Sequence, residues 1–285
     1  MSDGKLRVIL LTQGGCELVV EKLMEIESIE LCGIFIETDV IRRRGLRERI
    51  VRSLRYDGYA ATAIKFARSV FGSDLRQNKN QPSLVESREQ LKAIANQKVI
   101  PFFLVGNFHS QYSLELMHST NPDLGILLGT NILKESVFTI PRLGSINLHQ
   151  GLAPYYRGGP SVFWELTNGE SELGLTVHYV APKVDTGDIV LQRTVPLAYN
   201  YSYELDYQAF IDDFSRQLKL PCANLVADAV RMIADRTVVS IPQIPGIGKR
   251  YRLPTKSQKD ELKRRLRQRR AQAAYPVTQK ANIGD

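Results

Sequence analysis

Cysteine is scarce in this sequence, and the few that are present follow no ligand pattern. Cys16, Cys32 and Cys222 are far apart and match no metal-ligand spacing. Cys16 and Cys32 lie in or beside apolar runs, which favours reduced thiols in a cytosolic protein. We therefore predict that the protein has no metal site.

Long hydrophobic runs are missing too. No stretch approaches the roughly 20 apolar residues that a membrane-spanning helix needs. Residues 1–11 have a polar start and only a short apolar run, unlike a signal peptide. With 43% hydrophobic and 24% charged residues among 285, the composition is that of a soluble globular protein with one large core or two modest domains. We expect a cytoplasmic protein with no membrane partner.

Acidic residues are nearly absent from two short segments. Residues 42–55 hold seven arginines and one glutamate, and residues 263–270 hold six basic residues and no acid. Since the whole chain has a net charge of +8, the remainder carries −4. The basic character is therefore local, and it does not indicate a domain built around nucleic acid.

Apolar strands alternate with helical patterns along most of the chain. Residues 8–11 form a strand pattern, a glycine turn and helical spacing follow at 16–26, and residues 29–37 read as the next strand. This β–α–β order predicts an α/β protein with a parallel sheet. Further strands are expected at 98–106, 123–130, 145–149, 173–180 and 189–197. Further helices are expected at 42–72, 87–97, 112–120, 160–169, 203–234 and near the basic end.

Three helix boundaries carry specific predictions. Ser87, with Gln90 three residues later, resembles a capping box and predicts a helix that starts there. Pro160 is expected at the first position of the helix that ends at Gly169. Pro221 is expected to break the long helix that contains it.

An amide and an imidazole stand together in the segment GSINLHQGLAPYYRGG, residues 144–159. On a strand, the side chains of Asn147 and His149 leave the same face, where they could bind an oxygen that gains negative charge. A histidine in that role needs a carboxylate, for which Asp185 is the best candidate and Asp188 the second. Judged from these residues alone, an asparagine or histidine on a strand is more often a core or capping residue with its hydrogen bonds satisfied than a catalytic residue.

Residues 144–191 resemble the catalytic core of the folate-dependent formyltransferases, which include methionyl-tRNA, glycinamide ribonucleotide and sugar N-formyltransferases. The matching motifs are Asn147-Leu-His149, Leu152-Ala-Pro154-Tyr-Tyr-Arg157-Gly158 and Asp185-Thr-Gly187. The likeness implies a Rossmann-like formyltransferase fold, a mostly parallel sheet flanked by helices. It implies a catalytic domain at 1–200, with a helical, arginine-rich insertion at about 42–95, and a helical extension with a basic tail at 201–285.

The resemblance also implies a reaction, the transfer of a formyl group from 10-formyltetrahydrofolate to an amine without a metal. In it, Asn147 and a charged His149 would bind the formyl oxygen, while Asp185 holds His149 and helps to remove the amine's proton. His178 matches the family pattern, although a satisfied sheet histidine is the commoner reading. The pterin would contact the backbone of Ile132 and Leu133, which otherwise read as core, and the loop with Val184. The remaining substrate or loop residues are Gly14, Gly15, Pro154, Arg157 and Gly158, with Arg157 favoured as a loop residue.

The acceptor stays open, and we favour a small amine such as an amino sugar or a nucleotide-linked amine. The turn TQGGC lacks the Gly-x-Gly-Ser-Asn form of the glycinamide ribonucleotide enzymes, and only about 85 residues follow Asn200, where methionyl-tRNA enzymes have a β-barrel. Those two acceptors, and a formyltetrahydrofolate hydrolase, are alternatives. A non-enzymatic RNA-binding module is a less favoured alternative of another class. Residues 42–55 could cover the cleft, pair with the acidic remainder or join a homo-oligomer.

Overall fold

The computed structural model describes residues 4–39, 84–197 and 207–274, except for the side chains of 207–208 and 269–274. The helix expected at 42–72 and the basic segment 42–55 lie outside the described residues, as do the last two side chains of the basic segment 263–270.

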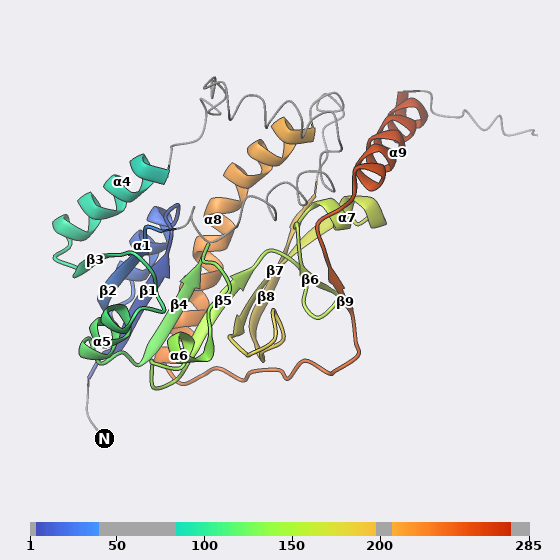
Figure 1. Ribbon diagram of the computed structural model, residues 1–285. Coiled ribbons are helices and arrows are strands. Elements are labelled where there is room, and N and C mark those ends of the chain that lie inside the picture. Colours follow the sequence, from blue (N-terminus) through green and yellow to red (C-terminus); the bar gives the residue numbers. More distant parts are fainter. Residues whose placement is uncertain (1–3, 40–83, 198–206, 275–285) are drawn as a thin grey trace, which may run out of the picture.

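Within the described residues, a seven-stranded sheet forms the centre of the molecule (Figure 1). Its order is β3-β2-β1-β4-β5-β7-β8. The pairs among β1 to β5 are parallel, whereas β7 is antiparallel to both β5 and β8. The predicted mostly parallel α/β sheet is confirmed. The strands are β1 (Leu6–Thr12), β2 (Ile29–Glu37), β3 (Phe102–Val105), β4 (Leu124–Leu128), β5 (Ser145–His149), β7 (Glu172–Tyr179) and β8 (Ile189–Pro196).

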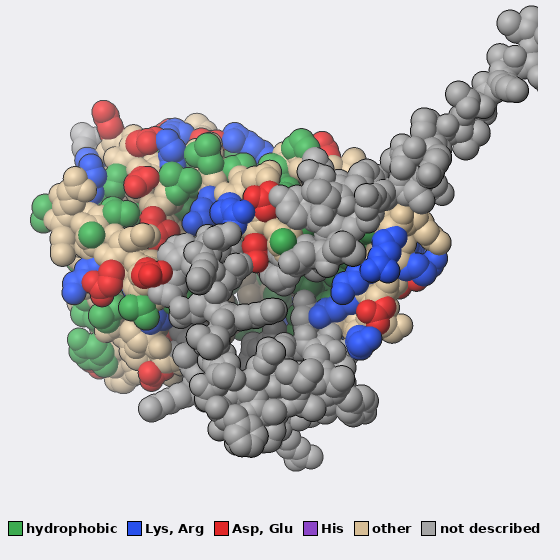
Figure 2. Space-filling view, turned by 90° about the horizontal axis from the view of Figure 1, so that it is seen from above, with side chains coloured by type: hydrophobic (Ala, Val, Ile, Leu, Met, Phe, Trp, Pro, Cys, Tyr) green, Lys and Arg blue, Asp and Glu red, His purple; other side chains and the backbone are tan. Residues whose placement is uncertain are grey.

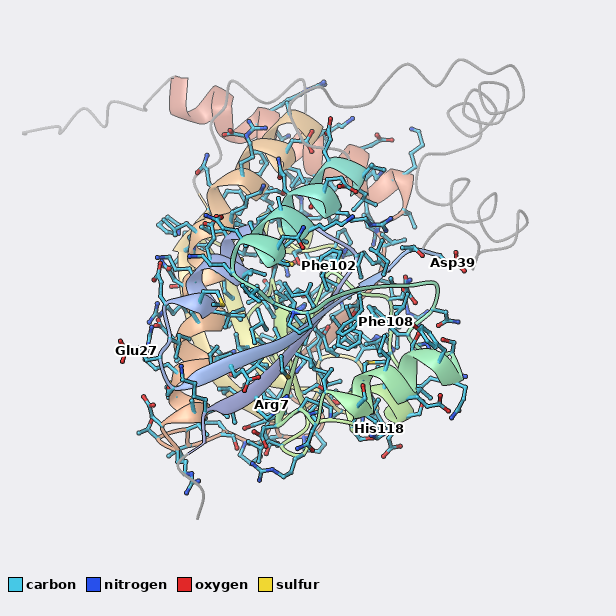
Figure 3. The ribbon with its side chains drawn as sticks, turned by 90° about the vertical axis from the view of Figure 1, so that its left-hand side faces the viewer. Arg7, Glu27, Asp39, Phe102, Phe108 and His118 are labelled. Carbon is cyan, nitrogen blue, oxygen red and sulfur yellow. The ribbon has the colours of Figure 1, made fainter. Side chains whose placement is uncertain are left out.

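Helices cover both faces of this sheet (Figures 1 and 3). Successive side chains of a strand point to opposite faces, so Val8 and Leu10 of β1 pack into one core and Ile9 and Leu11 into another. This is why β1, β2 and β4 are mostly apolar on both faces. The first core is covered by α1 (Glu17–Met24), α4 (Leu84–Gln97) and α8 (Tyr207–Ala234), and the second by α5 (Gln111–Ser119) and α6 (Glu135–Phe138).

A second, two-stranded sheet lies beside the main one. It pairs β6 (Tyr156–Gly158) with β9 (Lys249–Tyr251) in parallel, and sequence analysis predicted neither strand. The short α7 (Phe163–Asn168) follows β6, and α9 (Lys256–Ala274) follows β9 (Figure 1).

The expected role of Ser87 as a helix cap is wrong. Helix α4 already includes Leu84, so Ser87 lies within the helix and not before its first residue. The Ser87 side chain is buried, accepts a hydrogen bond from the N–H of Gly15 at 2.6 Å and donates one to Glu17. The Ser87 hydroxyl bonds to partners on another element instead of capping the helix, and the local sequence does not reveal those partners.

The predictions for the two prolines are also wrong. Helix α7 begins at Phe163 rather than Pro160, because Val162 has φ +72° and a left-handed residue cannot belong to the helix. Helix α8 runs through Pro221 without interruption. Pro221 costs one backbone hydrogen bond, but its buried neighbours Leu218 and Cys222 hold the helix against the core.

The described part of the basic segment 263–270 lies on α9, where Lys and Arg side chains gather at the right of Figure 2. Leu262 and Leu266 are buried on the opposite side, while Arg264 and Arg265 both bind Glu261. None of the helices in the described ranges is long and apolar enough to cross a membrane.

Candidate active site

Strand β5 brings Asn147 and His149 to the point where the sheet changes from parallel to antiparallel. β5 is parallel to β4 on one side and antiparallel to β7 on the other. In open α/β sheets, ligands bind in the crevice at the carboxyl ends of the strands, and β5 ends at His149. The position of these two side chains is therefore that of a binding site.

The turn between β7 and β8 returns Asp185 to the end of β5. One carboxylate oxygen, Oδ2, lies 3.5 Å from Nδ1 of His149, and the other, Oδ1, lies 3.5 Å from Nε2 of His178. The N–H of Gly158 donates a hydrogen bond to Oδ2 at 2.8 Å. Asp188 has an exposed side chain and is absent from this cluster, so the structure places the first candidate acid, and not the second, beside His149.

The hydrogen bonds of His149 define its protonation. Nε2 lies 2.6 Å from the carbonyl oxygen of Tyr156, which can only accept, so Nε2 carries a proton. Nδ1 then faces Asp185, and a second proton there would create an imidazolium next to a carboxylate. Burial lowers the pKa of His149 below its usual value, and the charge of Asp185 opposes this shift.

Asp185 is a carboxylate at neutral pH despite its burial. Burial alone would raise its pKa, but the hydrogen bond from His178, the charge of His149 and the N–H of Gly158 together hold the pKa below its usual range. The site therefore contains a fixed negative charge beside an imidazole that can gain a proton.

His178 completes the cluster, although sequence analysis gave it little weight. Its Nδ1 lies 2.7 Å from the carbonyl oxygen of Tyr179, and its Nε2 lies 3.3 Å from the amide nitrogen of Asn147. Asn147 and His178 are direct partners in the antiparallel ladder between β5 and β7. Strand register would have revealed this contact, but a single sequence does not encode register in any local pattern.

A cavity of about 180 Å³ lies on one side of the cluster. Asn147, His178 and Asp185 form part of its wall, and two loops form the rest. Ile132, Leu133 and Val184, the residues expected around the pterin, all line this cavity. Leu133 is also buried in the second core, whereas Ile132 is 74% exposed, so core packing does not explain Ile132.

A larger cavity, of about 620 Å³, lies on the other side. His149 lines it, as do Gly14 and Gly15 of the turn after β1 and Arg216 and Lys219 of α8. The cluster thus separates two cavities, with Asn147 and Asp185 on the smaller and His149 on the larger.

The glycine turn itself has little hydrogen-bonding capacity left. The N–H of Gly14 donates to the hydroxyl of Thr12 at 3.0 Å, and the N–H of Gly15 donates to Ser87. The carboxylate of Glu17 accepts from Ser87 next to them. An anion at this turn would have to displace these partners and approach a carboxylate.

The loop motif after β5 lies against the same cluster. The N–H of Gly158 donates a hydrogen bond to Asp185. The carbonyl oxygen of Pro154 lies against Gly248, and Arg157 lines a small cavity. The Nε atom of Arg157 is buried and has no hydrogen-bond partner among the described residues. Arg157 and His149 both line a small cavity next to Glu165, a residue that sequence analysis did not single out.

Glu165 is a buried carboxyl whose charge should destabilise the fold. Burial raises its pKa to about 7, so the folded protein holds a proton here that the unfolded chain releases at its ordinary pKa of about 4.3. The free energy of unfolding is therefore greatest near the unfolded pKa of about 4.3. It falls by about 3 kcal/mol as pH rises to about 7. Glu165→Gln should remove this loss, measured as free energy of unfolding in urea between about pH 5 and pH 8.

The control for Glu165 is Glu172→Gln, because Glu172 is exposed on β7. It should follow the pH dependence of the unchanged protein. If Glu165→Gln did so too, the Glu165 carboxyl would not be the proton-binding group.

Comparison with known proteins places this arrangement in a family. A family model described as Formyl transferase matches residues 53–217, more than half of the chain. The chain belongs to the formyl transferase family. The resemblance deduced from the three motifs is thereby confirmed.

Two such relatives are methionyl-tRNA formyltransferases. That of Parabacteroides distasonis is 35% identical over 130 residues, which are 46% of this chain and 38% of the relative. That of Bacteroides fragilis strain ATCC 25285 is 29% identical over 153 residues, 54% of this chain and 45% of the relative. The match spans less than half the length of these relatives.

Two solved structures have the same fold. A phosphoribosylglycinamide formyltransferase from Anaplasma phagocytophilum matches with a TM-score of 0.54 and 19% identity, over 86% of this chain and 97% of that one. A formyltetrahydrofolate deformylase from Pseudomonas syringae pv. tomato matches with a TM-score of 0.54 and 14% identity, over 85% and 67%. The expected Rossmann-like formyltransferase fold is confirmed.

Proposed function

We propose that the protein transfers the formyl group of 10-formyltetrahydrofolate to an amine, and that Asn147, His149 and Asp185 are the reacting side chains. The observation that carries this proposal is the 3.5 Å approach of Asp185 to His149 at the boundary between two cavities. A two-substrate transfer needs one cavity for the donor and one for the acceptor, with the catalytic groups between them.

The smaller cavity suits the pterin end of the donor. Loop segments around 130–133 and 180–185 surround it, so backbone N–H and C=O groups are close to a flat ring that carries many hydrogen-bonding atoms. The amide of Asn147 belongs to the same wall. The donor supplies a formyl carbon bound to a nitrogen that can leave.

In the proposed reaction, Asn147 donates an amide N–H to the formyl oxygen while that oxygen gains negative charge. His149 lies at the same strand end, and Asp185 stabilises its charged form. The attacking nitrogen forms a bond to the formyl carbon and loses a proton, which Asp185 accepts through water. The bond from that carbon to the leaving nitrogen breaks, and the leaving nitrogen takes up, through water, the proton that Asp185 accepted.

The larger cavity is the proposed acceptor site, and we favour an amino sugar or a nucleotide-linked amine. Arg216 and Lys219 line its α8 side, whereas Glu17 stands at the glycine turn, whose N–H groups are taken. A negatively charged group on the acceptor is therefore expected against α8 rather than at the turn. Methionyl-tRNA is the second candidate, because the relatives described above bear that name.

A panel of acceptors tests the proposal. The protein is incubated with 10-formyltetrahydrofolate and amino sugars, nucleotide-linked amino sugars, glycinamide ribonucleotide or methionyl-tRNA, and tetrahydrofolate release is followed. We expect release that depends on one class of amine and yields the formylated amine in equal amount. Release without any amine would identify a hydrolase, and no release with any acceptor would contradict formyl transfer.

A further inference from the structure

The strand β6 holds both members of the His149–Asp185 pair. The carbonyl oxygen of Tyr156, at the start of β6, accepts the hydrogen bond from Nε2 of His149 at 2.6 Å. The N–H of Gly158, at its end, donates to Asp185 at 2.8 Å. Three consecutive residues thus set the orientation of the imidazole and the position of the carboxylate.

This short strand is itself held by β9, from the segment expected to be a C-terminal extension. The register pairs Tyr156 with Lys249 and Gly158 with Tyr251. The N–H of Lys249 donates to the carbonyl oxygen of Tyr155 at 3.2 Å. Two strands of three residues are not stable alone in water, so further contacts must hold them together.

Aromatic side chains provide those contacts. The rings of Tyr156 and Tyr251 are stacked, with centroids 5.3 Å apart and planes at 9°. The amide of Asn168, at the end of α7, donates to both tyrosine hydroxyls at 2.9 Å. The indole N–H of Trp164 donates to the carbonyl oxygen of Arg252 at 3.0 Å. The α7 helix, β6 and β9 therefore form one unit beside the catalytic cluster.

Two glycines allow the strands to approach so closely. Gly248 has φ +75°, and a Cβ added there would overlap the carbonyl oxygen of Pro154. Gly158 has φ +78°, and a Cβ there would overlap the carbonyl oxygen of Tyr251. Glycine tolerates both the left-handed conformation and the close contact, so either position should resist substitution.

We propose that Tyr251 is a positioning residue of the catalytic centre, which acts through β6 on His149 and Asp185. The inference rests on the proposed function for its kinetic consequence, but the positioning itself can be observed without turnover. Residues of β6 and β9 do not line the smaller cavity. Loss of Tyr251 should therefore impair the chemical step and leave donor binding intact.

Steady-state kinetics with variants of the full chain provide the first test. Tyr251→Ala and Gly248→Ala should each lower kcat by about a hundredfold, since a displacement of about 1 Å in a catalytic group has effects of this size. KM for 10-formyltetrahydrofolate should stay within about twofold, because no residue of β6 or β9 lines the donor cavity and Asp185 is only one of its many wall residues. Tyr251→Phe keeps the stacked ring and should restore most of kcat. Tyr112→Ala is the matched control, because Tyr112 is an exposed tyrosine on α5.

Nuclear magnetic resonance of protein labelled at its four histidines provides the second test. The Nε2 proton of His149, bonded to a carbonyl at 2.6 Å, should give a downfield, slowly exchanging resonance in the unchanged protein and in Tyr251→Phe. The resonance should disappear in Tyr251→Ala and Gly248→Ala molecules that remain folded.

The two tests separate this inference from the proposed function. Folded Tyr251→Ala and Gly248→Ala variants that keep the resonance and unchanged kcat would overturn the positioning role of Tyr251. A variant that only loses stability would show the resonance and the unchanged kcat in its folded fraction. That result also contradicts the inference. An unchanged protein that shows the resonance but transfers formyl to no acceptor would contradict only the proposed function.

Discussion

Replacing His149 with alanine should lower kcat for formyl transfer by about a thousandfold, in line with the loss of a proton-donating or charge-stabilising group in a buried site. The side chain bridges the two proposed substrate sites, since it lines the larger cavity and faces Asp185 through Nδ1. Tetrahydrofolate release at saturating donor measures the loss. Circular dichroism and thermal unfolding should show that the fold survives.

The control for His149 is His118→Ala. His118 lies exposed on α5, on the face of the sheet opposite α8, and is labelled in Figure 3. This variant should keep full activity. A His149→Ala protein with at least a third of the original kcat would remove the imidazole from the mechanism. RNA binding that persists in this variant, with no folate turnover in the unchanged protein, would favour the RNA-binding alternative instead.

Asp185→Asn should lower kcat by about a hundredfold or more, because it removes charge while keeping shape. The asparagine oxygen can still accept the hydrogen bond from Gly158, but the amide neither stabilises a charged imidazole nor accepts a proton. The carboxylate now opposes the effect of burial on His149, so its loss should lower the pKa of His149 further. Titration of the His149 ring by nuclear magnetic resonance measures this shift.

The pH dependence of the unchanged protein gives a related expectation. The pKa of Asp185 lies below its usual range, so the catalytic carboxylate should stay ionised as pH falls, until the pH is below the range typical of aspartate.

Asp188→Asn is the matched control for Asp185→Asn, because Asp188 lies in the same turn with an exposed side chain. If the two asparagine variants had equal activity, Asp185 would not be the acid that serves His149.

Most of the sheet was predictable because its signals are local. Buried central strands must be apolar on both faces, and glycines follow β1 and β4 closely, so β1, β2 and β4 stand out in the sequence. The failures at Ser87, Pro160 and Pro221 share one cause. In each case a contact or backbone conformation set by the tertiary structure outweighed the local preference of the residue.

The candidate site was predictable in part, for the same reason. Asn147 and His149 are neighbours on one strand, and the family motifs connect them to Asp185. His178 received little weight because its contact with Asn147 depends on the register of β5 and β7. Glu165 and Tyr251 gave no signal, since neither has a distinctive sequence neighbourhood and each matters through the elements packed around it.

By itself, the sequence determined the α/β class, the parallel core and the residues able to stabilise a developing charge. These follow from side-chain periodicity and from chemistry carried within short segments. Only the tertiary structure decided that Asp185 rather than Asp188 meets His149, that two cavities flank the pair, and that β9 supports β6. Such contacts join distant segments, and their geometry depends on how whole layers pack, which no short stretch of sequence encodes.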